Sequence, residues 1–506
     1  MTKASIAAAA PSPATVFPVV GFGASAGGLE ALTQVFNHLP GDTGMAFVVI
    51  QHLDPTHRSM LRELLAKTTP MPVVEVKEGL EVAPNHVYVI PPNAHMAISE
   101  GRLRLLERGG GRGSHMPIDA FFRSLADERG ALAIGVILSG AASDGTLGLR
   151  AIKDGGGVTF AQDRVSAKYD SMPVSAVAAG GVDFVLPPER IGDELQRLAR
   201  HPYVASLAAG ETALPPVTAE AALQEVFTLM RRAIGVDFTY YKHTTILRRI
   251  HRRMMLRHID KLADYAVYLR NHAEEIPALY NDVLINVSSF FRDPECYEGL
   301  STEVLPSLMA NRPPEAPLRA WVAGCAGGEE AYSLAITILE HFAATGNSVP
   351  VQIFATDISE AAIEKARSGT YSDSAVQAVS PDRLRRFFTK ADGGYRVAKS
   401  VRDICLFARQ DLTRDPPFSK LDIVSCRNVL IYLGPVLQKK IVPVFHYALK
   451  PDGYLVLGNS ETIGAFADLF DLVDKKGKIY RRKAAAAHAI LDALAPHPLE
   501  PLVHAA

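Results

Sequence analysis

Three side chains able to support hydrolysis follow apolar segments in the amino-terminal part of the chain. Ser25 lies in the glycine-rich turn GFGASAGG, His52 follows the apolar run Phe47–Ile50, and Asp144 follows the run Ile134–Leu138. Apolar runs that alternate with helical patterns indicate a parallel α/β sheet, whose strands all end at one edge. At that edge a serine nucleophile, a histidine base and an orienting aspartate could together attack a carbonyl carbon.

A glycine-rich turn between a strand and a helix more commonly holds a dinucleotide or a phosphate. A dinucleotide site needs an acid at the end of the second strand, but the residues there are Gln51 and His52. No lysine follows the glycines, as a phosphate loop would require. The turn alone leaves both interpretations open, whereas the three side chains together favour a nucleophile, with backbone N–H groups to hold the oxyanion. The chain order Ser, His, Asp differs from that of the α/β-hydrolases.

Five motifs occur in a fixed order between about residues 16 and 200: GFGASAGG, QHLDPTH, HMPIDAFFRSLA, ILSGAASDGTLGL and AQDRVSAKYDSMPVSA. They resemble the catalytic domain of the chemotaxis receptor methylesterases (CheB-like), which hydrolyse methyl esters of receptor glutamates and can deamidate glutamines. The resemblance implies the triad roles for Ser25, His52 and Asp144. Ala26 stands where the family often has threonine, and Ala142 stands where glycine gives the oxyanion loop its conformational freedom.

A second glycine-rich turn, AGCAGGEE at 323–330, follows the apolar run Leu318–Ala323 and ends in paired carboxylates. The next apolar run, Val351–Asp357, ends in an acid that suits the ribose of a dinucleotide or of S-adenosylmethionine. The turn lacks the GxGxxG spacing of dinucleotide sites, and Glu329 suits the ammonium of a methionine moiety better than a pyrophosphate. We therefore favour S-adenosylmethionine, whose sulfonium already activates the methyl group, so that catalysis needs mainly positioning.

Three further motifs, LINVSSFFRD, FARQDL and VSCRNVLIY, surround this turn. With it they resemble the chemotaxis receptor methyltransferases (CheR-like) over about residues 218–482. That family esterifies receptor glutamates with S-adenosylmethionine. The resemblance implies ten residues that line the cofactor: Asn286, Ser288, Arg292, Glu329, Asp357, Asp411, Leu412, Arg427, Asn428 and Tyr432. Arg292 and Tyr432 would lie near the transferred methyl group, and Ser288 and Asp411 replace the threonine and asparagine that are frequent in the family.

The composition is that of an ordinary globular protein, with 48% hydrophobic and 21% charged residues among 506 and a net charge of −1. This balance gives no indication of nucleic acid binding. Four cysteines without paired spacing favour neither a disulfide framework nor a metal site and are typical of a cytoplasmic protein. Because no apolar run of about 18 residues is present, we expect a protein that is not embedded in a membrane.

A basic run lies between residues 242 and 257, and no acid follows it until Asp260. A solvated helix face is the default interpretation of such a run. The methyltransferase resemblance implies instead a docking face for acidic helices of a chemoreceptor or a similar helical signalling protein. Attraction of this kind would speed encounter and weaken with salt.

The predicted fold class is α/β, with two doubly wound, Rossmann-like parallel sheets. We expect a disordered lead at 1–15, an esterase-type domain at 16–201, a linker at 202–217, a helical domain at 218–286, a methyltransferase-type domain at 287–483 with a β insert near 387–407, and a disordered tail at 484–506. The strands predicted for the two sheets are Val16–Gly21, Ala46–Gln51, Val87–Ile90, Ala133–Ser139, Val158–Ala161 and Phe184–Leu186, then Leu318–Ala323, Val351–Asp357, Leu421–Ser425 and Tyr454–Leu457.

These patterns predict a bifunctional signalling enzyme that forms a glutamate methyl ester and hydrolyses it to glutamate and methanol. Two alternatives stay open. In the first, Ala26, Ala141 and Ala142 mark a degenerate esterase-like binding module beside an active methyltransferase. In the second, the chain is a scaffold of a two-component signalling system.

Overall fold

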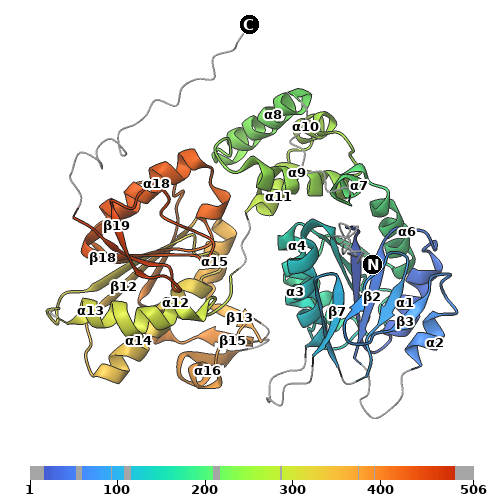
Figure 1. Cartoon of the computed structure of the whole chain (residues 1–506), viewed down its shortest axis with the longest axis horizontal. Helices are drawn as coiled ribbons and strands as arrows, with labels where there is room; N and C mark the ends of the chain where they lie inside the picture. Colours follow the sequence, from blue (N-terminus) through green and yellow to red (C-terminus); the bar gives the residue numbers. More distant parts are fainter. Residues whose placement is uncertain are drawn as a thin grey trace, which may run out of the picture. The chain divides into compact units, whose positions relative to one another are not determined.

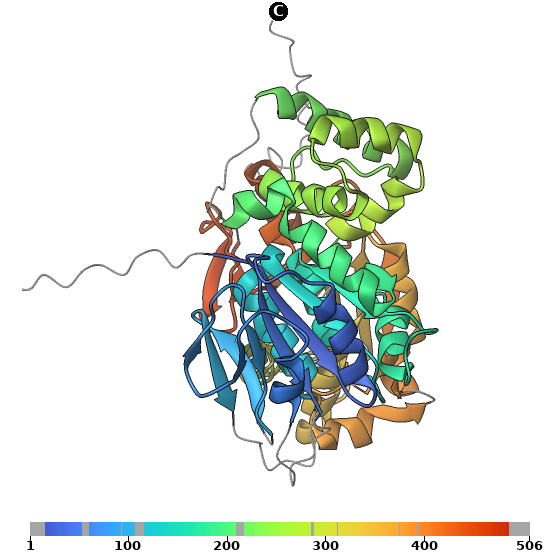
Figure 2. The same ribbon diagram turned by 90° about the vertical axis from the view of Figure 1, so that its right-hand side faces the viewer.

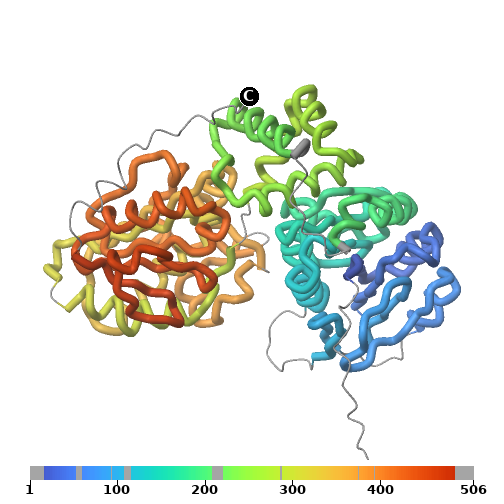
Figure 3. The backbone as a smooth tube through the Cα atoms, turned by 45° about the horizontal axis from the view of Figure 1, so that its top comes forward, coloured from blue at the N-terminus to red at the C-terminus, as the bar shows by residue number. Residues whose placement is uncertain are grey.

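A computed structural model describes residues 16–52, 60–92, 94–106, 116–208, 217–284, 288–310, 312–373, 375–391 and 394–484. The chain forms two compact units, each with its own sheet (Figures 1 and 3). The first unit comprises Met1–Val226 and Leu247–Asp282, and the second comprises Phe227–Ile246 and Val283–Ala506. Within the described ranges, no helix combines the length and apolar character that crossing a membrane requires.

The first unit is built on a seven-stranded sheet in the order β10-β9-β8-β1-β2-β5-β3, and all neighbouring strands run parallel. The strands are β1 (Val19–Ala24), β2 (Ala46–Gln51), β3 (Val73–Glu75), β5 (Val87–Val89), β8 (Ala133–Ile137), β9 (Val158–Gln162) and β10 (Phe184–Leu186). The sequence predicted all of these strands except β3. Strand β1 begins and ends three residues later than the predicted Val16–Gly21.

Helices cover both faces of this sheet (Figure 2). One core layer packs α1 (Gly28–Asn37), α2 (Leu61–Leu65) and α6 (Pro188–Ala199) against it. The other packs α3 (Pro117–Arg129), α4 (Thr146–Gly155) and α5 (Ser171–Ala178). The strands β1, β8 and β9 are buried at every residue, because a parallel sheet covered on both faces has no side open to water. The first unit also contains a separate small antiparallel sheet, whose strands in spatial order are β4 (Leu80–Glu81), β7 (Arg102–Leu106) and β6 (His95–Ser99).

The helical segment begins earlier than expected. Helix α7 (Pro202–Ala208) occupies the first part of the predicted linker at 202–217 and places Val204 in the core of the first unit, which corrects the linker prediction there. Four helices then follow: α8 (Val217–Ile234), α9 (His243–Arg257), α10 (Leu262–Asn271) and α11 (Glu275–Val283). The division between the two compact units passes through α8 and α9, so that most of α9 groups with the first unit.

The second unit is built on a seven-stranded sheet in the order β16-β12-β11-β17-β18-β20-β19. Its parallel strands are β16 (Cys405–Arg409), β12 (Val351–Asp357), β11 (Leu318–Ala323), β17 (Leu421–Cys426) and β18 (Leu449–Leu457). The strands β20 (Ile479–Arg482) and, at the edge, β19 (Phe470–Asp474) are antiparallel and were not predicted. Helices α14 (Glu329–Thr345) and α18 (Pro435–Ala448) pack on opposite faces, because alternate residues of β11 enter different cores.

The predicted β insert is a three-stranded antiparallel sheet with limits that differ from those expected. It consists of β13 (Thr370–Ser372), β15 (Gly394–Val397) and β14 (Phe388–Ala391). Strand β16, which the prediction placed inside the insert, pairs in parallel with β12 of the main sheet. Alternating hydrophobicity predicts a strand but not the sheet that it joins, which explains this error.

Candidate active sites

The turn after β1 places Ser25 at the carboxyl edge of the first sheet. The Ser25 N–H donates to the Ser139 carbonyl oxygen at 3.0 Å, which ties the turn to the end of β8. Gly27 has φ 73°, and a Cβ there would lie 2.8 Å from Ser139 Oγ, so only glycine suits this position. Ser139 Oγ in turn donates to the Ala26 carbonyl at 2.8 Å. These hydrogen bonds therefore fix the turn that carries Ser25.

His52 and Asp144 meet at the same edge. His52 Nε2 lies 2.8 Å from Asp144 Oδ2, and the His52 N–H donates to the Ala24 carbonyl at 3.2 Å, directly beside Ser25. Asp144 is only 2% exposed, and the first turn of α3 holds its carboxylate: Ile118 N donates to Oδ2 at 3.0 Å and Asp119 N to Oδ1 at 2.9 Å. A helix amino terminus supplies such unpaired N–H groups and favours negative charge. With Nε2 facing the carboxylate, Nδ1 is the nitrogen that would accept the serine proton.

The loop before Asp144 holds one alanine in a backbone conformation that is strained for any residue with a Cβ. Ala142 has φ 69°, in the left-handed region that a Cβ disfavours. Gly140, two residues earlier, has no room for a side chain, because a Cβ would lie 2.9 Å from Ser25 Cβ and 2.2 Å from Met172 Sδ. The loop thus passes close to the serine with one residue in a conformation that glycine adopts more easily.

Asp119 is a buried acid in this site to which the sequence analysis assigned no role. It is 1% exposed; Oδ1 accepts from Gly148 N at 2.7 Å, and Oδ2 is buried without a hydrogen-bond partner among the described residues. Burial raises the pKa of Asp119 to about 6, and the nearby charge of Asp144 adds to the shift. Its place inside the motif HMPIDAFFRSLA was the one available signal.

The second site is built on the turn between β11 and α14. The N–H groups of Gly324 and Cys325 donate to the Thr356 carbonyl of β12 at 2.8 and 2.9 Å. The next N–H, that of Ala326, donates to Asp357 Oδ2 at 2.9 Å, and Ser359 N donates to Oδ1 at 2.9 Å. Burial raises the pKa of Asp357, while these backbone hydrogen bonds lower it in part. The turn and the acid at the end of β12 are therefore one hydrogen-bonded assembly.

Glu329 presents one carboxylate oxygen that the protein does not use. It is 4% exposed; Oε1 accepts from Lys365 Nζ at 2.9 Å, whereas Oε2 is buried without a partner among the described residues. A Cβ at Gly327 would lie 2.9 Å from both carboxylate oxygens, so the glycine leaves a cradle at this point. A buried carboxylate oxygen with spare acceptor capacity fits an ammonium group such as that of S-adenosylmethionine.

Arg427 directs its guanidinium to protein groups. It is 5% exposed, and its donors reach Asp293 Oδ2 at 2.8 Å, the Arg292 carbonyl at 2.5 Å and the Tyr297 hydroxyl at 3.2 Å. Asp293 has φ 56°, so this contact holds a strained segment that carries the exposed Arg292. In this structure Arg427 positions the segment on which Arg292 lies.

Two further acids organise the rest of the site: Glu461, which no motif indicated, and Glu330, which was recognised only as one of the paired carboxylates that end the turn. Glu461, 2% exposed, accepts from Asn428 N at 2.8 Å and Gly458 N at 2.7 Å, which fixes Asn428 at φ 61°. Glu330 accepts from Ser425 Oγ at 2.6 Å, and burial raises its pKa although the charge of Arg427 lowers it. Glu461 lies far from every motif, so spacing gave no signal for it.

The other predicted cofactor residues occupy varied environments. Asp411 Oδ1 accepts from Thr413 N at 2.9 Å and Thr413 Oγ1 at 2.6 Å, which makes a local turn, and Leu412 packs against a core of the second unit. Ser288 is half-buried just before Phe290. The Tyr432 carbonyl accepts from Lys242 N at 3.0 Å. Asn286 lies outside the described residues.

Comparison with known families agrees with this division of the chain. A family model for CheB methylesterase matches residues 20–195. A model for the CheR methyltransferase all-alpha domain matches residues 221–284, and one for its SAM binding domain matches residues 286–479.

Individual relatives cover one part or both. An uncharacterized 104.1 kDa protein of Rhodobacter capsulatus is 37% identical over 85% of this chain, which spans 47% of that protein. Chemotaxis protein methyltransferase 2 of Vibrio cholerae is 32% identical over 47% of this chain and 83% of its own length. A Burkholderia pseudomallei protein-glutamate methylesterase/protein-glutamine glutaminase is 37% identical over 40% of this chain and 59% of its own length. The solved Thermotoga maritima CheB methylesterase catalytic domain is 30% identical, with a TM-score of 0.34, over 36% of this chain and 98% of that one.

Replacement of Ala142 by glycine tests the strained loop. Because Ala142 has φ 69°, Ala142→Gly is expected to raise the unfolding free energy by about 1 kcal/mol, measured by chemical denaturation. Ala141→Gly is the matched control, since Ala141 is outside the left-handed region and glycine there should lower stability by about 0.5–1 kcal/mol. Equal effects of the two substitutions would show that Ala142 is not strained.

The buried acid predicts a pH dependence of stability. The pKa of Asp119 is raised from 3.8 to about 6 in the fold, so its contribution is fully present below pH 3.8 and is lost as pH rises through 6. The unfolding free energy of Asp119→Asn minus that of wild type should therefore rise by about 3 kcal/mol as the pH is raised from 4 to 7. Thermal or chemical unfolding at several pH values measures this, with Asp127→Asn on the exposed side of α3 as control. An unchanged difference across this range would contradict the prediction.

Glu329→Gln tests the cofactor site. Loss of the carboxylate charge should weaken binding of S-adenosylhomocysteine roughly 10- to 100-fold, since hydrogen bonds to charged groups contribute about 1.5–3 kcal/mol. Isothermal titration calorimetry measures the change. The control is Glu364→Gln, whose side chain is 63% exposed and pairs with Arg367. Equal affinity of the Glu329 variant and wild type would remove Glu329 from the site.

Proposed function

We propose, from the premise that this chain belongs to the CheR methyltransferase family and carries a CheB methylesterase domain ahead of it, that its two sites act on one bond. That bond is the methyl ester of a glutamate side chain in a chemoreceptor or a similar helical signalling protein. The second unit would form the ester with S-adenosylmethionine, and the first would hydrolyse it. The hydrogen bond from His52 to the helix-held Asp144 is the observation that carries the proposal, because a degenerate module would have no need of it.

Ester hydrolysis would use the three side chains at the first edge. Ser25 Oγ attacks the ester carbonyl as His52 Nδ1 takes its proton, and the buried Asp144 stabilises the imidazolium that forms. Collapse of the tetrahedral intermediate transfers the proton to the departing oxygen and releases methanol. Water then attacks the acyl-serine with the same base, which returns Ser25 and leaves a free glutamate.

Ester formation needs no proton transfer. When bound, S-adenosylmethionine would supply a methyl group that its sulfonium already activates for transfer to a glutamate oxygen. The residues of the second unit would only bind and orient: Glu329 the ammonium through its unused Oε2, and Asp357 the ribose hydroxyls.

The four cysteines, all buried with free thiols, are consistent with a cytoplasmic location.

One alternative keeps specific support. Ala142 occupies a left-handed position in the loop that would hold the oxyanion, so the first unit could bind a methylated protein without hydrolysing it. In that case the chain would act as a methyltransferase with an attached recognition module.

The test uses S-adenosylmethionine labelled in its methyl group, incubated with the full chain and chemoreceptor-containing membranes. Base-labile label on protein and volatile methanol are followed for wild type, Ser25→Ala and the control Ser175→Ala. We expect methanol from wild type and the control only, and more protein-bound label with Ser25→Ala. Equal labelling by all three proteins without methanol would leave only the transferase function.

A further inference from the structure

Three arginines of the basic helix α9 are withdrawn from water. Arg249 is 1% exposed, Arg252 is fully buried, and the side chain of Arg253 is 11% exposed. This finding corrects the prediction of a solvent-facing docking surface over 242–257 for these three residues. Lys242 and Arg257 are exposed, and for them that prediction still stands.

Two of these arginines bind the esterase-type part of the first unit. Arg252 Nε donates to the Gly157 carbonyl at 2.8 Å, and its Nη2 donates to Asp183. Arg249 donates to the Lys153 carbonyl at 3.0 Å and to the Asp154 carbonyl. Those carbonyls belong to the last turn of α4, where the helix dipole favours a cation.

The carboxylate that receives Arg252 is part of the sheet structure. Asp183 directly precedes β10, has a side chain that is 2% exposed, and accepts from Thr159 N at 3.0 Å and Thr159 Oγ1 at 2.9 Å. Burial alone would raise the pKa of Asp183, but the charges of Arg252 and Lys153 outweigh it, so the pKa lies below its ordinary value. Arg252 and Asp183 therefore form a paired buried ion bridge, in which each charge needs the other.

The same arginines bind the rest of the helical segment. Arg252 Nη1 donates to Asp282 of α11 at 2.5 Å. Arg253 binds Glu275 with two hydrogen bonds of 2.7 and 2.8 Å, and the Tyr265 hydroxyl donates to Glu275 at 3.0 Å. These contacts with the fully buried Glu275 connect α10 and α11 to α9. Arg252 connects α9 in turn to the sheet.

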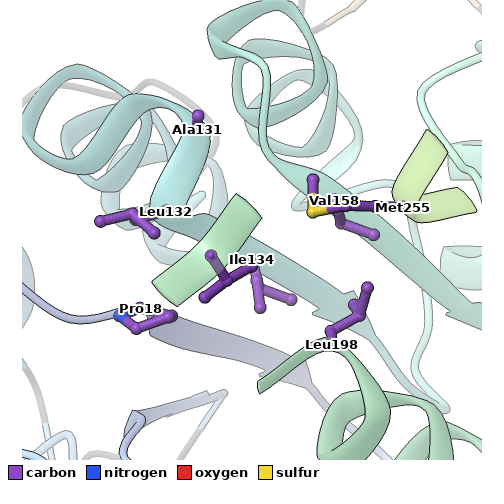
Figure 4. Close-up of a pocket in the computed structure, with 8 residues that line it drawn as sticks. Pro18, Ala131, Leu132, Ile134, Val158, Leu198 and Met255 are labelled. Carbon is purple, nitrogen blue, oxygen red and sulfur yellow. The ribbon is translucent and has the colours of Figure 1, made fainter. Parts of the chain in front are cut away.

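Apolar packing completes the contact. Met255 of α9 is 1% exposed and belongs to the core layer that contains α1 and α6. Figure 4 shows it beside Val158, with Leu198 and Ile134, around a small apolar pocket. His251 stacks on Tyr203 of α7 at 4.6 Å between ring centroids, and burial lowers the pKa of His251 to about 4, which keeps the ring neutral here.

We propose that α9 is an intrachain docking helix whose partner is the face formed by the end of α4 and the starts of β9 and β10. In this role Arg249, Arg252 and Met255 fix residues 247–282 to the esterase-type sheet. These arginines then cannot contact an acidic partner protein while the segment is docked. An acidic helix could use them only by displacing Asp183 and the α4 carbonyls.

The docking face lies away from the catalytic edge. Gly157 and Asp183 precede β9 and β10, whereas Ser25, His52 and Asp144 follow the strands β1, β2 and β8. In a parallel sheet these are opposite edges. The docked helix therefore leaves the catalytic edge of the sheet uncovered.

Hydrogen–deuterium exchange of the full chain tests the proposal. Arg252→Met and Asp183→Asn each remove one partner of the buried bridge, so amides of 247–282 should exchange roughly 100-fold faster. The control Glu225→Gln alters a pair with Arg270 whose side chains are 35% and 56% exposed, and it should change nothing.

The pattern of protection decides each outcome. Faster exchange in 247–282, alone or together with β1 and β2 but not with β11 and β12, supports docking to the esterase-type sheet. Unchanged exchange in both variants overturns the proposal, and so does loss of protection shared with β11 and β12. If Asp183→Asn unfolds the first unit, Arg249→Met gives the same readout without leaving a buried acid unpaired, because Arg249 donates to backbone carbonyls.

Discussion

Each site depends on a hydrogen bond between the turn that leaves the first strand of a parallel sheet and the end of the neighbouring strand. In the first unit, Ser25 N donates to the Ser139 carbonyl; in the second, the N–H groups of Gly324 and Cys325 donate to the Thr356 carbonyl. Ser25 is partly buried and the second turn is largely buried, so these donors need partners, and the glycines allow the required approach. Once the turn is held, the side chains at the strand ends are brought to a common edge.

Buried carboxylates are the second common feature of the two units. Asp144 is held by backbone donors at the start of α3, Asp357 by the turn after β11, and Asp183 by Arg252. Among the acids of the described residues that keep a buried oxygen without a hydrogen-bond partner, two lie in the candidate sites: Asp119 beside the hydrolytic site and Glu329 in the cofactor site. Because an unsatisfied buried oxygen is unfavourable, these two positions are where added charge, protons or ligand should have the largest effect.

The sequence predicted the strands that carry the hydrolytic residues, although β1 ends three residues later and β8 two residues earlier than expected, and it did not predict the docking of α9. Ser25, His52 and Asp144 follow buried apolar runs, so parallel topology alone places them at one edge, and the strain at Ala142 followed from a residue type. Arg252 is buried because it pairs with Asp183, almost 70 residues earlier, and no local sequence pattern links the two residues. The same reason hid Glu461 and the sheet that β16 joins, since both depend on contacts distant in sequence.

The central claim is that one chain forms and hydrolyses the same ester. Its most direct test is the ratio of methanol to S-adenosylhomocysteine at steady state, with purified full-length protein and a limiting amount of receptor helices. If both sites act on one bond, this ratio approaches one methanol per S-adenosylhomocysteine, and both products continue to form after every target glutamate has been methylated once. A single burst of S-adenosylhomocysteine without methanol would contradict the account.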